Sequence, residues 1–115
     1  MVDLAMTETW RDICPSDHLI DNVGICALVQ ERQIAIFRLS DGTLYAIDNH
    51  DPFSDAAVLS RGVVGDLKQQ PVVASPIYKH HFNLQTGRCL EDDTVTLTTY
   101  PVRIDNGVVQ VLVHE

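Results

Sequence analysis

Positive charge is scarce in this chain, and long apolar runs are missing. Eight Lys and Arg residues stand against sixteen Asp and Glu residues, which gives a formal net charge of −8. Nucleic acids and anionic membrane surfaces bind clusters of Lys and Arg, so we expect neither as a partner. A run of about 18 apolar residues is also lacking, so no transmembrane helix is predicted. A protein partner with a basic face is compatible with the charge.

Recognisable catalytic motifs are also lacking. The sequence has no Gly-rich phosphate-binding loop and no histidine spacing typical of zinc proteases. Its three cysteines, Cys14, Cys26 and Cys89, are widely spaced and form no C-x-x-C motif. We interpret them as reduced structural residues of a cytoplasmic protein, and a metal site that uses all three is the alternative. Residues 1–13 show no basic segment followed by an apolar run, so we expect no signal peptide.

Short β-strand patterns fill most of the chain. Apolar runs rich in β-branched residues recur at residues 24–30, 33–39, 43–47, 71–74, 95–97, 100–104 and 108–113. Ile34 and Phe37 lie on opposite faces of their run, which predicts a strand that is covered on both sides. We expect a tight turn at residues 31–32, and Asn106-Gly107 is the strongest hairpin signal. Many short strands at close spacing predict a single all-β domain over residues 1–115.

Two proline-containing loops interrupt these strands. The first reads Asp51-Pro52-Phe53, the second reads Ser75-Pro76-Ile77-Tyr78, and an F-x-x-x-T-G segment follows at residues 82–87. This arrangement resembles the cluster-binding region of Rieske iron–sulfur domains. There, Cys-Pro-His and Cys-Pro-x-His loops supply two cysteine and two histidine ligands to a [2Fe-2S] cluster.

The resemblance places the four ligand positions at Asp51, Phe53, Ser75 and Tyr78. A carboxylate, a phenyl ring, a hydroxyl and a phenol cannot replace the thiolates and imidazoles that hold such a cluster. The resemblance therefore implies a Rieske-like frame without its cluster. We expect Phe53 to fill the space that the cluster leaves and Tyr78 to be half-buried. The alternative is that both rings remain exposed and contact a partner.

A more specific resemblance is to the small subunit of bacterial NADH-dependent nitrite reductase. It rests on residues 10–14, 26–28, 34–38, 51–53, 58–62, 74–76 and 107–110. It implies a two-sheet β-sandwich with a small loop-rich subdomain inserted at about residues 48–88. It also implies a large catalytic subunit as the partner, with FAD, siroheme and an iron–sulfur cluster in that partner. The small subunits of this family have no known catalytic residue, so we assign no catalytic, cofactor-binding or metal-binding residue here.

Two alternatives differ in chemistry from a cofactor-free accessory subunit. A Rieske-type ferredoxin would carry electrons, but that role requires the four cluster ligands. A mononuclear metal site could use His50 and Asp51 together with His80 or His81. Adjacent residues in an extended segment point to opposite sides, so only one of His80 and His81 could face His50.

Overall fold

The computed structural model describes residues 8–114, and these residues form mainly β-strands. The strands are β1 (Glu8–Pro15), β2 (Ile25–Val29), β3 (Arg32–Arg38), β4 (Leu44–Asp48), β5 (His50–Asp51), β6 (Ala56–Ala57), β7 (Val63–Leu67), β8 (Gln70–Ala74), β9 (His81–Asn83), β10 (Thr99–Tyr100), β11 (Val102–Asp105) and β12 (Val108–His114). Two short 3₁₀ helices, η2 (Ser16–His18) and η3 (Leu59–Arg61), complete the elements. Residues 1–7, which include much of the segment considered for a signal peptide, and residue 115 lie outside the described part.

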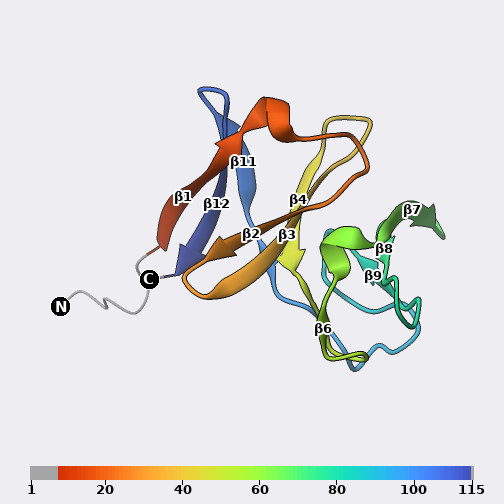
Figure 1. The fold of residues 1–115 in the computed structure, drawn as a ribbon. Helices are drawn as coiled ribbons and strands as arrows, with labels where there is room; N and C mark the ends of the chain where they lie inside the picture. The colour runs from red at the N-terminus through yellow and green to blue at the C-terminus, as the bar shows by residue number, and fades with distance from the viewer. Residues whose placement is uncertain (1–7, 115) are drawn as a thin grey trace.

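Two antiparallel sheets form the larger part of the fold (Figure 1). One sheet has the strand order β1-β12-β11, and the other has the order β10-β4-β3-β2. Side chains from both sheets meet in one hydrophobic cluster, which makes the pair a β-sandwich. The predicted all-β fold with a two-sheet sandwich is therefore confirmed.

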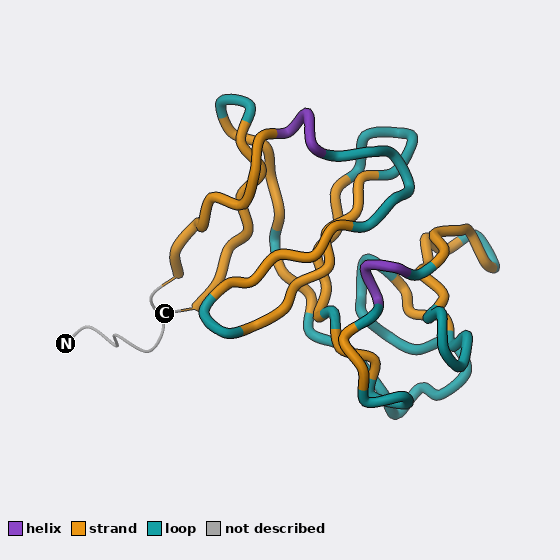
Figure 2. The backbone as a smooth tube through the Cα atoms, viewed as in Figure 1, coloured by secondary structure: helices purple, strands orange, loops and turns teal. Residues whose placement is uncertain are grey.

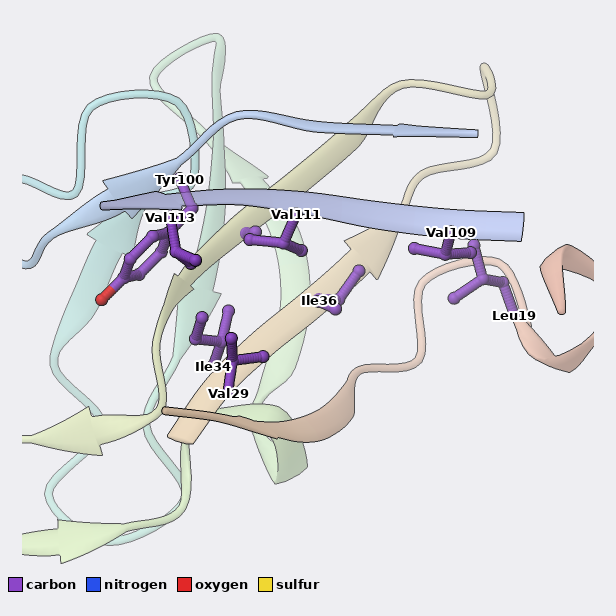
Figure 3. Packing of buried hydrophobic residues seen from close by; sticks show 9 residues of the cluster. Leu19, Val29, Ile34, Ile36, Tyr100, Val109, Val111 and Val113 are labelled. Carbon is purple, nitrogen blue, oxygen red and sulfur yellow. The ribbon is translucent and has the colours of Figure 1, made fainter. Parts of the chain in front are cut away.

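Strand β3 has an apolar side chain on both of its faces. Ile34 and Ile36 lie in the cluster between the two sheets, where they approach Val109, Val111 and Val113 of β12 (Figure 3). On the other face, Ala35 and Phe37 belong to a second cluster that contains Leu59, Val73, Phe82, Leu84, Cys89 and Leu97. The prediction that this strand is covered on both sides is confirmed, and the second cluster attaches the two loops to the sandwich.

The hairpin turns agree with the sequence at one position and differ at another. Asn106 and Gly107 have φ values of 50° and 76°, and they connect β11 to β12 as predicted. The turn between β2 and β3 lies at Gln30 and Glu31, with φ values of 51° and 67°, one residue earlier than predicted. Both turns have two residues with positive φ, which suits the twist of a two-residue hairpin. Neither residue of the Gln30 turn is a glycine, so the register of this hairpin was hard to predict.

The other differences from the predicted strands lie in the second half of the chain. Strand β7 was missed because Gly65 and Asp66 break its apolar pattern. Residues 95–97, predicted to form a strand, make only a single bridge, between Thr96 and Arg88. The predicted strand at residues 100–104 is divided at Pro101, which has no N–H group to donate to a ladder.

Residues between β4 and β10 form two small sheets at one end of the molecule (Figure 2). One pairs β5 with β6, and the other has the order β7-β8-β9. These small sheets present the two proline-containing loops. Their treatment as an inserted subdomain at about residues 48–88 stays a prediction. In the described part of the chain, no helix is long and apolar enough to cross a membrane.

Candidate functional site

The two proline-containing loops are joined by a hydrogen bond between buried side chains. Asp51 ends β5 and is 0% exposed, and Ser75 follows β8 and is 1% exposed. The Ser75 hydroxyl donates to Oδ2 of Asp51 over 2.5 Å. The resemblance to Rieske domains had placed both residues at the positions of the two cysteine ligands. A buried carboxylate–hydroxyl contact therefore connects the two loops.

The other carboxylate oxygen of Asp51 organises its own loop. Oδ1 accepts a hydrogen bond from the Phe53 N–H at 2.9 Å, and the Asp51 carbonyl accepts one from the Asp55 N–H at 2.8 Å. Burial disfavours the charged form of Asp51. The hydrogen bonds from the Ser75 hydroxyl, the Phe53 N–H and Ser54 outweigh that effect and lower the pKa of Asp51 below its usual value. Asp51 is thus a carboxylate that the fold keeps ionised in a buried position.

A second contact between the loops is aromatic. The Phe53 ring stacks on the His80 imidazole, with 3.7 Å between the ring centroids and 5° between the planes. The same phenyl ring lies 6.2 Å from the buried Phe82 ring and packs half-buried against the second cluster. The residue before His80, Lys79, has a φ of 64°, and the His80 carbonyl accepts a hydrogen bond from the Ser75 N–H at 2.9 Å. The left-handed turn at Lys79 therefore precedes the ring that covers Phe53.

Asn49 connects the first loop region to the sandwich through hydrogen bonds. This role was not predicted from the sequence. Asn49 is buried, and its carbonyl accepts a hydrogen bond from the Leu59 N–H at 3.0 Å. Its side-chain oxygen accepts another from the Ser60 N–H at 2.7 Å. Its amide group donates to the Gln33 side chain at 3.2 Å. Asn49 therefore connects the start of η3 to Gln33 of β3 in the sandwich.

The structure separates the histidines that formed the alternative metal site. His50 pairs with Asp55 at 2.7 Å, His80 stacks on Phe53, and His81 pairs with Glu91 at 2.7 Å. Among residues 8–114, no cluster of three or more His, Cys, Asp or Glu side chains is arranged to hold a metal ion.

Glu91, the first residue of the acidic run at residues 91–93, contacts β9. Its carboxylate accepts hydrogen bonds from the His81 N–H and pairs with the His81 ring, each over 2.7 Å. Partial burial disfavours its charged form, but these contacts outweigh burial and lower the pKa of Glu91. Glu91 therefore connects the segment after Cys89 to β9.

Tyr78 differs from its predicted position. The ring was expected to be half-buried, but the residue is 63% exposed and lies at the end of the second loop. His80, two residues later, is the residue of this loop that stacks on Phe53. Sequence reasoning treated His80 as surface or as a metal ligand, and it missed this stacking role.

The three cysteines do not gather into one site. All are free, with Cys89 buried in the second cluster and Cys26 exposed on β2. Burial raises the pKa of each thiol, Cys14 included. A raised pKa favours the protonated thiol at neutral pH.

The chain is similar to one protein family and to several known proteins. Residues 9–112 match the family model of the Rieske-like [2Fe-2S] domain. A protein of Escherichia coli (strain K12) named nitrite reductase (NADH) small subunit is 41% identical over 102 residues, which cover 88% of this chain and 94% of that protein. A Mycobacterium tuberculosis crystal structure, assigned as an NADH-dependent nitrite reductase small subunit, superposes with a TM-score of 0.90 at 43% identity and covers 95% of this chain and 98% of that one.

A third relative has a different architecture. The nitrite reductase [NAD(P)H] large subunit of Klebsiella oxytoca is 43% identical to this chain over 102 residues. The match covers 89% of this chain but 11% of the large subunit. A homologous domain is therefore one small part of that long polypeptide.

Proposed function

The chain belongs to the family of Rieske-like [2Fe-2S] domains and, within it, to the small subunits of NADH-dependent nitrite reductase, and from this we propose that it is a cofactor-free accessory subunit of that enzyme. In this role it assembles with a large catalytic subunit in the cytoplasm, and the complex reduces nitrite to ammonium with electrons from NADH. The observation that carries the cofactor-free part is the buried hydrogen bond between Asp51 and Ser75.

The residues at the four former ligand positions do not fit a [2Fe-2S] cluster. Asp51 and Ser75 are hard oxygen donors that bond to each other, and Phe53 has no donor atom. Tyr78 is exposed at the end of its loop. Clusters of this type require soft thiolates together with imidazoles. The two loops instead close on each other through the Asp51–Ser75 and Phe53–His80 contacts.

Purified protein is expected to be colourless and free of stoichiometric iron and acid-labile sulfide. Visible absorption, iron analysis and sulfide analysis measure this directly. The same measurements after incubation with ferrous iron, sulfide and thiol are a more demanding test, because a competent Rieske site would acquire its cluster there. A chromophore with two irons per chain after either treatment would contradict the proposal.

Redox chemistry in the complex is assigned to the large subunit. The family resemblance implies that FAD, siroheme and an iron–sulfur cluster reside there, and cofactors of this kind carry hydride and electron transfer. The isolated small subunit is therefore expected neither to oxidise NADH nor to reduce nitrite. The test measures NADH-dependent ammonium formation by each subunit alone and by the two together. Turnover by the isolated small subunit would refute its accessory role.

A Rieske-type ferredoxin is the alternative function. An electron carrier of this class must hold its cluster, so the same absorption spectrum distinguishes a ferredoxin from a cofactor-free subunit. The contact of Asp51 with Ser75 favours the accessory subunit over the carrier.

A further inference from the structure

Apolar side chains are exposed together at the outer end of the second loop. Ile77 is 44% exposed and Tyr78 is 63% exposed, and Pro76 before them is exposed as well. Val63, which is 72% exposed, begins β7 opposite Ala74, the last residue of β8. Val63 therefore lies at the same end of the β7–β8 pair as the loop. We call Val63, Pro76, Ile77 and Tyr78 the loop-tip surface.

The loop that carries this surface is held in place from its base. The Ser75 N–H donates to the His80 carbonyl at 2.9 Å, which closes the loop on itself. The Ser75 hydroxyl binds buried Asp51, and the Ile77 N–H lies 3.4 Å from the same hydroxyl oxygen. An apolar surface on a fixed loop loses little conformational freedom when it binds. The loop-tip surface is thus ordered before any partner arrives.

We propose that the loop-tip surface is the contact through which this chain docks on the large subunit of nitrite reductase. The proposal rests on the proposed function and adds the place of contact. Exposed aromatic and aliphatic side chains on a rigid support are typical anchors of protein interfaces. On this proposal the large subunit presents an apolar socket that receives Ile77 and the ring of Tyr78.

The relative from Klebsiella oxytoca identifies the occupant. A domain homologous to residues of this chain is there part of the large-subunit polypeptide itself. A covalent connection keeps such a domain next to the body of the large subunit, at high effective concentration. The large subunit is therefore the partner that we assign to the loop-tip surface.

The ends of the described chain leave the loop-tip surface free for this contact. Glu8 pairs with His114, so the first and last described strands, β1 and β12, end side by side. Figure 1 shows these ends on the left of the molecule and β7, β8 and β9 on the right. A polypeptide connection at Glu8 or His114 enters at the end remote from the loop-tip surface. In a fused protein, the domain can thus turn its loops toward the large-subunit body.

Charge and apolar contact have separable effects on this docking. The chain has a net charge of −8, whereas none of the four residues of the loop-tip surface is Asp, Glu, Lys, Arg or His. Long-range charge affects mainly the association rate, and buried anchors affect mainly the dissociation rate. Higher salt is therefore expected to slow association, and removal of the anchors is expected to speed dissociation.

The test measures association and dissociation rates of the small subunit on immobilised large subunit from the same host. The double variant Ile77→Ser/Tyr78→Ser is expected to dissociate at least about 30-fold faster, with an association rate within about twofold of the unmodified protein. Leu28→Ser is the matched control, because Leu28 is 75% exposed and lies beside Arg11 and Asp12 of the sandwich. Leu28→Ser is expected to leave both rates unchanged.

Three outcomes are distinguishable. Unmodified protein that binds, with fast dissociation only for the double variant, supports the loop-tip surface. Equal rates for all three proteins, or a loss confined to Leu28→Ser, overturn it while the proposed function stands. Unmodified protein that fails to bind the large subunit overturns the proposed function and the docking surface together. Thermal unfolding of each variant, and the single variant Tyr78→Ser, separate a lost contact from a lost fold.

Discussion

Replacement of Asp51 by alanine is expected to lower the free energy of unfolding by about 4 kcal/mol. Asp51 is fully buried, and its carboxylate accepts hydrogen bonds from the Ser75 hydroxyl and the Phe53 N–H. Alanine leaves both donors buried without that acceptor, and it opens space at the base of both loops. Chemical denaturation with a fluorescence or circular dichroism signal measures the loss.

Asp41 provides the matched control for this substitution. Its Oδ1 accepts a hydrogen bond from the N–H two residues later, at Thr43 and 2.9 Å, as Asp51 does from Phe53. The Asp41 turn is exposed, so water replaces the lost acceptor and Asp41→Ala is expected to have a far smaller effect. Equal losses for the two alanine variants would show that burial at Asp51 does not matter.

The effect of Asp51 on stability is also expected to depend on pH. Its pKa in the folded protein is lowered, so the folded state favours the ionised form. This contribution is fully present above the pKa of the unfolded chain, about 3.9, and it disappears as the pH falls through the lower folded value. The stability difference between unmodified protein and Asp51→Ala should therefore narrow in acid. A difference that grows toward low pH would contradict the lowered pKa.

Replacement of Phe53 by alanine is expected to lower the free energy of unfolding by about 3 kcal/mol. The half-buried phenyl ring packs on the second cluster and stacks on His80, so its removal leaves a cavity between the loops. A loss of this size is expected of a side chain that fills the space between the two loops. Denaturation curves measure the effect, and Phe53→Leu should recover part of the loss because it restores apolar volume.

Tyr78→Ala is the control for this second substitution. The Tyr78 ring is exposed, so its removal is expected to change stability by about 0.5 kcal/mol or less. A Phe53→Ala variant as stable as Tyr78→Ala would mean that the Phe53 ring supports nothing in the free protein. Phe53 would then be an interface residue like its neighbours at the loop tip.

Local patterns in the sequence were sufficient for most of the sandwich. The alternation around Ile34 and Phe37 marks a strand with two apolar faces, and Asn106-Gly107 marks a hairpin, because both signals depend only on neighbouring residues. Strand β7 was missed because its pairing with β8 supports a segment whose own pattern is broken by Gly65. Burial on pairing, rather than local preference, determines such strands.

The site was predictable in position but not in its contacts. The Rieske-like spacing of the two loops indicated Asp51 and Ser75, but no local rule states that these two side chains bond to each other. The stacking of His80 on Phe53 depends on how the loops approach and on the left-handed conformation of Lys79. A lysine carries little signal for such a conformation, since positive φ is favoured mainly by glycine and asparagine.

Strand β3 contributes to both hydrophobic clusters, so we expect the domain to unfold as one cooperative unit. Ile36 on one face packs in the cluster between the two sheets. Phe37 on the other face packs in the second cluster, which contacts the loops. Opening of the loop region would therefore expose apolar side chains of β3, a strand that also belongs to the sandwich. Opening of the loop region is therefore expected to cost more free energy than opening of a loop that shares no cluster with the rest of the domain. A substitution at the base of the loops, within the cluster that contains Phe37, is therefore expected to destabilise the loops and the sandwich together.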